Sequence, residues 1–131
     1  MAQRVAVIED DPAIGSMLKT ILALEGYEVA TFGDGKSAVP SLRSGRFDAV
    51  ILDIMLPGQD GIAVLRDIRG AHETERIPVV MLTAKTDDVT TWAGWQAGCD
   101  WFLTKPFDPD DIVRVLRRIA EPGYGAGEAP G

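Results

Sequence analysis

Short apolar runs rich in β-branched residues alternate along this chain with longer segments of helical periodicity. The runs cover Val5–Ile8, Tyr27–Phe32, Phe47–Leu52, Ile77–Leu82 and Trp101–Leu103. Several are nearly continuous in hydrophobicity, which is typical of strands buried on both faces of a parallel sheet. The first segment between them carries one apolar stripe at helical spacing, formed by Ile14, Met17, Leu18, Ile21 and Leu22. Asp11, Pro12 and Gly26 are suited to cap, begin and end that helix.

Five strands and five helices in strict alternation predict an α/β fold. We expect a flavodoxin-like, doubly wound parallel sheet of five strands in the order 2-1-3-4-5, covered by five helices in a three-layer sandwich. Residues 1–121 are expected to form one domain. Residues 122–131, rich in glycine and proline, are expected to be a flexible tail or the stub of a linker.

Composition narrows the classes of function. The chain has 131 residues and a formal net charge of -7, so direct binding to nucleic acid is not expected, and no residues remain for a separate DNA-binding module. Its one cysteine, Cys99, forms no internal disulfide. The apolar run nearest the N-terminus, Val5–Ile8, is too short for a signal peptide or a membrane span. These observations predict a cytoplasmic protein without membrane contact.

Polar side chains gather where the predicted strands end. In the expected strand order these ends are neighbours, so their side chains converge on one site. They are Glu9, Asp10 and Asp11 after the first strand, Asp53 after the third, Thr83 after the fourth and Lys105 after the fifth. Crowded carboxylates repel one another unless a cation joins them, and a hard divalent ion with oxygen ligands fits best. We therefore predict Mg²⁺, with Mn²⁺ able to substitute.

This combination of groups suits a phosphoryl group. Asp53 can act as a nucleophile and become an aspartyl phosphate, while Thr83 donates a hydrogen bond and Lys105 supplies a positive charge. An acidic run alone is more often a solvated cap, and Lys105 alone an ordinary surface lysine. Their common position at one end of one sheet favours the functional interpretation.

Four motifs, in this order along the chain, resemble the receiver domain of bacterial two-component response regulators. They are Val-Ile-Glu-Asp-Asp-Pro (7–12), Leu-Asp-Ile-Met-Leu-Pro-Gly-Gln-Asp-Gly (52–61), Leu-Thr-Ala (82–84) and Ala-Gly-Cys-Asp-Trp-Phe-Leu-Thr-Lys-Pro-Phe (97–107). The resemblance implies a phosphorylation-dependent switch. A sensor histidine kinase or a histidine phosphotransfer protein would be the phosphodonor.

The resemblance also implies residue roles at the phosphorylation site. Asp53 matches the phosphoacceptor and, with Asp10, a side-chain Mg²⁺ ligand; Glu9 matches the acidic residue that holds the metal through water. The backbone carbonyl of Met55 matches a further ligand, and Lys105 matches the phosphate-binding lysine. The bond from Lys105 to Pro106 is implied to be cis.

A second group of implied roles concerns the output of the switch. Thr83 and Phe102 match its hydroxyl and aromatic residues. Their movement would remodel the face formed by the fourth helix, the fifth strand and the last helix, where Trp92, Trp101 and Val115 are candidate partner residues. A downstream effector or a second copy of the chain would bind there.

The chain departs from the family pattern in two respects. Thr91, Trp101 and Val115 stand where charged residues of a salt-bridged dimer are usual, so a stand-alone regulator or a partner with apolar contacts is favoured. Met55 and Lys85 occupy the positions that tune loss of the phosphoryl group. Neither is a carboxylate or an amide, which predicts slow autodephosphorylation and no other enzymatic activity.

Two alternatives stay open from the sequence. One is a receiver-like scaffold that binds partners without phosphorylation. The other is a small Mg²⁺-dependent phosphohydrolase that forms an aspartyl phosphate; enzymes of the haloacid-dehalogenase type, however, need a second aspartate where this chain has Met55.

Overall fold

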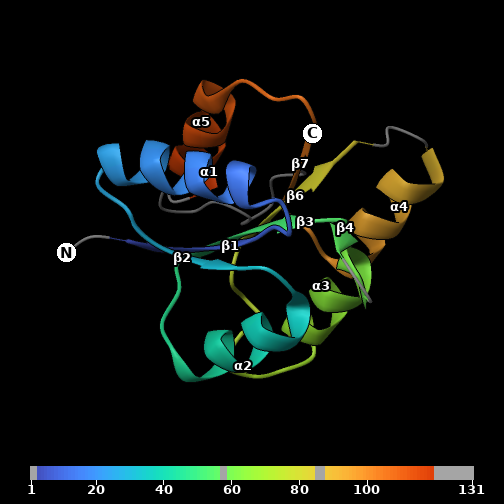
Figure 1. Ribbon diagram of the computed structural model, residues 1–131. Helices are drawn as coiled ribbons and strands as arrows, with labels where there is room; N and C mark the ends of the chain where they lie inside the picture. Colours follow the sequence, from blue (N-terminus) through green and yellow to red (C-terminus); the bar gives the residue numbers. More distant parts are fainter. Residues whose placement is uncertain (1–2, 57–58, 85–87, 120–131) are drawn as a thin grey trace.

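The computed structural model describes residues 3–56, 59–84 and 88–119, and a five-stranded parallel sheet forms its centre (Figure 1). Its strands are β1 (Arg4–Ile8), β2 (Glu28–Phe32), β3 (Ala49–Asp53), β6 (Val79–Thr83) and β7 (Trp101–Thr104). They lie in the order β2-β1-β3-β6-β7, which is 2-1-3-4-5 when only the strands of this sheet are counted. All four pairings are parallel, so the predicted fold class is confirmed.

Helices cover both faces of the sheet. They are α1 (Pro12–Leu24), α2 (Gly35–Ser44), α3 (Gly61–Arg69), α4 (Asp88–Ala97) and α5 (Pro109–Ile119). Figure 1 shows α1 and α5 on one side of the sheet and α2 and α3 on the other. The predicted three-layer sandwich is therefore confirmed. No helix among the described residues is long and apolar enough to span a membrane.

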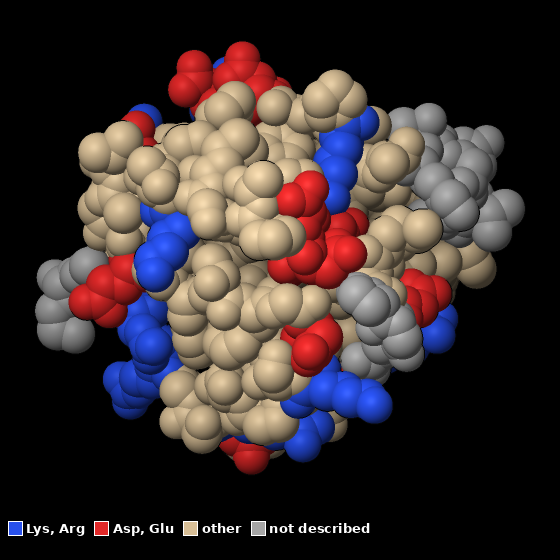
Figure 2. All heavy atoms as spheres, in the orientation of Figure 1, with Lys and Arg blue, Asp and Glu red and all other residues tan. Residues whose placement is uncertain are grey.

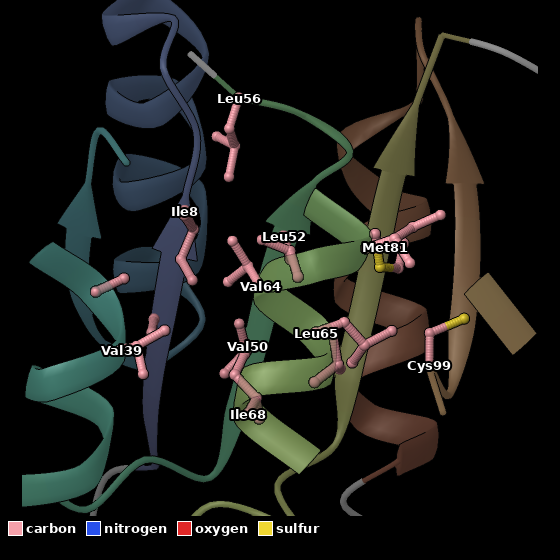
Figure 3. Close-up of a cluster of buried hydrophobic side chains, with 14 of the residues drawn as sticks. Ile8, Val39, Val50, Leu52, Leu56, Val64, Leu65, Ile68, Met81 and Cys99 are labelled. Carbon is pink, nitrogen blue, oxygen red and sulfur yellow. The ribbon is translucent and has the colours of Figure 1, made fainter. Parts of the chain in front are cut away.

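Each face of the sheet has its own hydrophobic core. On the α2 and α3 side, buried side chains from β1, β3 and β6 meet Val64, Leu65 and Ile68 of α3 (Figure 3). On the α1 and α5 side, Leu18 and Leu22 pack with residues of α5 against the opposite face of the same strands. Side chains alternate between the two faces of a strand, and helices cover both faces of the sheet. Successive residues of β1, β3 and β6 are therefore buried, which explains the nearly continuous hydrophobicity of these strands.

The residues at the ends of the helices favour a helix start or a helix end. Asp11 caps α1 through its Oδ1, which accepts a 2.9 Å hydrogen bond from the Ala13 amide, and Pro12 is the first helical residue. Gly26, just beyond the helix, has a φ of 94°, a conformation that glycine adopts without strain. Asp34 and Asp60 likewise cap α2 and α3, where they accept hydrogen bonds from the Ser37 and Ile62 amides.

The structure adds one feature that the hydrophobic pattern did not predict. The two-residue strands β4 (Met55–Leu56) and β5 (Gln59–Asp60) pair as a small antiparallel hairpin between β3 and α3. Strands this short have no hydrophobic period to detect. The predicted tail, residues 122–131, lies outside the described residues.

Candidate functional site

The register of the parallel strands brings Glu9 and Asp53 together. Ile8 of β1 pairs with Leu52 of β3, and Glu9 and Asp53 are the next residues along the two neighbouring chain segments. Carboxylate oxygens of Glu9, Asp10 and Asp53 all lie within 4.8 Å of one another. Glu9 and Asp53 are buried, whereas Asp10 is exposed. Figure 2 shows acidic side chains gathered near the middle of this face of the molecule.

Lys105 closes the acidic cluster from the neighbouring side of the sheet. Its Nζ lies 2.9 Å from Asp53 Oδ2 and 3.1 Å from Glu9 Oε2. The position of Lys105 follows from the sheet, because Thr104 pairs with Thr83 and the Lys105 amide donates to the Thr83 carbonyl at 2.8 Å. The peptide bond between Lys105 and Pro106 is cis. The Lys105 ammonium group thus pairs with two of the three carboxylates of the cluster.

Burial and charge crowding shift the protonation of this cluster. Burial raises the pKa of Glu9 to about 7; the neighbouring Asp53 adds to this rise, and Lys105 opposes it. Burial lowers the pKa of Lys105, but hydrogen bonds to Asp53 and Glu9 outweigh burial, so its pKa is raised overall. The raised pKa of Glu9 thus reflects chiefly the burial of its carboxylate and secondly the nearby Asp53 carboxylate.

The second carboxylate oxygen of Asp53 is held by its own loop. The Met55 amide donates a 3.0 Å hydrogen bond to Asp53 Oδ1. The start of α3 presses against this loop, where the Gly61 amide donates to the Ile54 carbonyl at 2.8 Å. A Cβ on Gly61 would overlap the Asp53 carbonyl oxygen and lie 2.6 Å from the Ile54 Cα. Glycine at position 61 is therefore required by the close approach of two backbone segments, and it helps to fix Asp53.

The two predicted switch residues lie on adjacent strands. Thr83 ends β6 and is buried, and Phe102 is a half-buried residue of β7. The Phe102 ring packs edge-on against Trp95 of α4, with 5.2 Å between ring centroids. Lys85, one of the two predicted tuning residues, lies outside the described residues, whereas Met55 is 56% exposed beside the cluster.

The three predicted partner residues do not form one patch. Trp101 and Val115 line a groove of about 370 Å³ between β7 and α5, together with Leu103, Asp111, Arg114 and Arg118. Val115 itself is buried, so it contributes to the floor of the groove. Trp92 is 64% exposed on α4 and is not part of the groove lining.

The residues present fit a divalent cation. The cluster offers carboxylate oxygens from three residues, two of them buried, and Lys105 is the ammonium group that pairs with it in the part of the chain that the structure describes. Oxygen donors and an excess of negative charge suit Mg²⁺ and Mn²⁺ better than softer metals. The exposed Asp10 leaves one side of the cluster open to water.

Sequence reasoning missed Arg69, which ties four segments together at the opposite end of the sheet. Its guanidinium donates to the carbonyls of Gly98 and Ile77 at 2.9 and 2.6 Å and pairs with Asp100 at 3.0 Å. Asp100 in turn accepts from the Val79 amide at 2.8 Å. Arg69 thereby fastens the end of α4 to α3 and to the starts of β6 and β7. Nothing in the local sequence distinguishes Arg69 from an exposed helical arginine.

Comparison with known proteins agrees with this site. A family model described as response regulator receiver domain matches residues 5–117. Among curated proteins, the DNA-binding response regulator MtrA of Mycolicibacterium smegmatis is 44% identical over 117 residues, covering 89% of this chain and 50% of that protein. The chain thus spans about half the length of the curated relatives it matches.

Solved structures show the same fold. A response regulator from Chloroflexus aurantiacus superposes with a TM-score of 0.86 at 33% identity, covering 91% of this chain and 98% of that one. The receiver domain of a sensor histidine kinase from Pseudomonas aeruginosa, described with a magnesium ion coordinated in its active site cleft, gives a TM-score of 0.83 at 33% identity. It covers 90% of this chain and 97% of that chain.

Proposed function

This chain belongs to the response regulator receiver domain family, whose members act in phosphorylation-dependent two-component signalling, and we propose that Asp53 is its phosphoacceptor. One observation carries the proposal: Asp53 is buried at the centre of the acidic cluster, with Lys105 Nζ 2.9 Å from Oδ2 and the Met55 amide 3.0 Å from Oδ1. A structural aspartate has no need of this acidic environment, which favours a cation; the cation and Lys105 would together neutralise a phosphoryl group.

The phosphodonor is a phosphorylated histidine of a sensor kinase or a histidine phosphotransfer protein. An Asp53 carboxylate oxygen attacks the phosphorus atom. The O–P bond forms as the P–N bond breaks, and the imidazole nitrogen keeps the electron pair and takes a proton. Lys105 then pairs with a phosphoryl oxygen in place of a carboxylate. The Thr83 hydroxyl, at the end of the adjacent strand β6, donates to another phosphoryl oxygen.

Asp10, Asp53 and the Met55 backbone carbonyl would hold Mg²⁺ or Mn²⁺ directly, and Glu9 through a water molecule. The cation supplies charge neutralisation for the phosphoryl oxygens. Glu9 supports this assignment because its carboxylate is buried, and burial is the main reason that its pKa is raised to about 7. A bound cation would stabilise the ionised carboxylate and so lower that pKa.

Phosphorylation is read out through Thr83 and Phe102. Thr83 moves toward the phosphoryl group, and the Phe102 ring changes position between β7 and α4. The surface of α4, β7 and α5 then binds an effector or a second copy of the chain. The exposed Trp92 and the groove lined by Trp101 and Val115 support this surface as the partner site.

The intact mass of the protein after incubation with acetyl phosphate and Mg²⁺ tests the phosphoacceptor. We expect one added phosphoryl group on the wild type and on the control Asp110→Asn, and none on Asp53→Asn. A wild type that gains no phosphoryl group from acetyl phosphate or from any histidine donor would instead support a phosphorylation-independent scaffold.

A further inference from the structure

Met55 places a thioether beside the proposed phosphoacceptor, on a backbone that is fixed at two points. The Met55 amide donates a 3.0 Å hydrogen bond to Asp53 Oδ1, and Met55 pairs with Asp60 in the β4–β5 hairpin. Side chains alternate along β4, so Leu56 is buried whereas Met55 is 56% exposed. The side chain at position 55 is therefore held next to the Asp53 carboxylate and is open to small solutes.

Among the described sulfur-containing side chains, that of Met55 is the most accessible to an oxidant. Met17 is 37% exposed, and Met81 is buried. Cys99 is buried as well, and burial raises the pKa of its thiol to about 12, so the reactive thiolate is scarce. Susceptibility to peroxide follows exposure. We therefore expect Met55 to react first and Met17 more slowly.

Oxidation turns the thioether, a weak hydrogen-bond acceptor, into a strongly polar one. Hydrogen peroxide transfers one oxygen atom to the sulfur as its O–O bond breaks. The sulfur loses two electrons, and the second peroxide oxygen leaves as water. In methionine the sulfur occupies the place that the amide carbon occupies in glutamine. The sulfoxide oxygen of an oxidised methionine thus lies where a glutamine side-chain oxygen would be.

An acceptor at position 55 favours hydrolysis of an aspartyl phosphate on Asp53. Asp53 is buried, so the attacking water reaches the phosphorus from the solvent side, where Met55 is exposed. The sulfoxide oxygen accepts a hydrogen bond from this water and orients it. A bond from the water oxygen to phosphorus forms as the bond from phosphorus to the Asp53 oxygen breaks. The carboxylate keeps the electron pair, and both protons of the water leave with the phosphate.

We propose that Met55 is a site of reversible oxidation whose sulfoxide shortens the lifetime of the phosphoryl group on Asp53. Peroxide then switches the phosphorylated protein off without a phosphatase, and methionine sulfoxide reductase restores the slow loss. This inference rests on the proposed phosphoacceptor role of Asp53 and adds a regulation of that site.

Peroxide treatment of the wild type, Met55→Leu and the control Met17→Leu tests the inference. Each protein is treated with hydrogen peroxide and freed of it, and peptide mass mapping locates the added oxygen. The proteins are then labelled with acetyl phosphate and Mg²⁺, and the lifetime of the phosphoryl group is followed by intact mass after acetyl phosphate is removed. A parallel sample is first reduced with methionine sulfoxide reductases that act on both sulfoxide epimers.

We expect peroxide to shorten the lifetime several-fold in the wild type and in Met17→Leu, and reduction to restore it. Treated and untreated Met55→Leu should have the same lifetime as each other. Met55→Gln should match the oxidised wild type and should not respond to peroxide. The melting temperature should change little because the Met55 side chain is exposed, which distinguishes an oriented water from a loosened site.

Three outcomes overturn the inference alone. They are a Met55 that stays unoxidised while Met17 reacts, an oxidised Met55 with an unchanged lifetime, and an equal shortening by peroxide in Met55→Leu. A wild type that no histidine donor and no acetyl phosphate can label overturns the phosphoacceptor proposal instead. The two failures are therefore distinguishable.

Discussion

The ring of Phe102 occupies the space in which a side chain at position 94 would lie. A Cβ on Gly94 would overlap Phe102 Cζ and lie 2.7 Å from Cε2. The ring is also held edge-on by Trp95, the next residue of α4. The absence of a side chain at Gly94 thus allows the proposed switch aromatic to sit against the helix.

Gly94→Ala should displace the Phe102 ring. Although alanine favours a helix over glycine, the overlap with the ring should lower the free energy of unfolding by about 1–2 kcal/mol. Urea unfolding of the wild type, Gly94→Ala, Phe102→Ala and the double variant measures the coupling. In the Phe102→Ala background, Gly94→Ala should no longer lower the free energy of unfolding. Strictly additive losses in the double variant would contradict the contact between the two residues.

Lys105→Met should strengthen Mg²⁺ binding and slow phosphorylation. The Lys105 ammonium lies within 3.1 Å of both Glu9 and Asp53, so it repels a cation at the same carboxylates. We expect a several-fold higher affinity for Mg²⁺, measured by titration of tryptophan fluorescence, together with slower labelling by acetyl phosphate. Lys36→Met, on the exposed start of α2, is the control. An unchanged affinity would argue against a metal site at this cluster.

The phosphorylated protein should lose its phosphoryl group slowly, with a lifetime of minutes or longer. Met55 is exposed beside Asp53 and offers no group that positions an attacking water. Met55→Gln introduces an amide at that position and should shorten the lifetime several-fold. The lifetime is measured by intact mass after removal of acetyl phosphate. A wild-type lifetime of seconds would refute the prediction.

Arg69→Met should destabilise the fold without altering the phosphorylation site. Removal of the guanidinium leaves the Gly98 and Ile77 carbonyls and the Asp100 carboxylate without this donor. Because the pair is partly exposed, we expect a loss of about 2 kcal/mol in the free energy of unfolding. Arg66→Met, exposed on the same helix, should cost little. Equal losses in the two variants would mean that Arg69 is not a tie between segments.

The hydrophobic pattern was enough to predict the sheet, its strand order and the end at which the polar groups gather. The segment Ala49–Leu52 is hydrophobic without interruption because β3 is covered on both faces, and that burial leaves a local trace in the residue pattern. The N-cap of α1 was equally predictable, since Asp11 acts on an amide two residues away.

The contacts between side chains distant in sequence depend on how the elements pack. The contact of Lys105 with both Glu9 and Asp53 depends on the register of three strands, and the four-segment tie of Arg69 depends on the positions of α3 and α4. The roles of the glycines also depend on packing. Glycine is needed at positions 61 and 94 because another segment approaches closely, whereas a Cβ on Gly15 or Gly33 would meet no atom within 4 Å. A glycine looks the same in a sequence whatever surrounds it, because its role is set by neighbours that local periodicity does not encode.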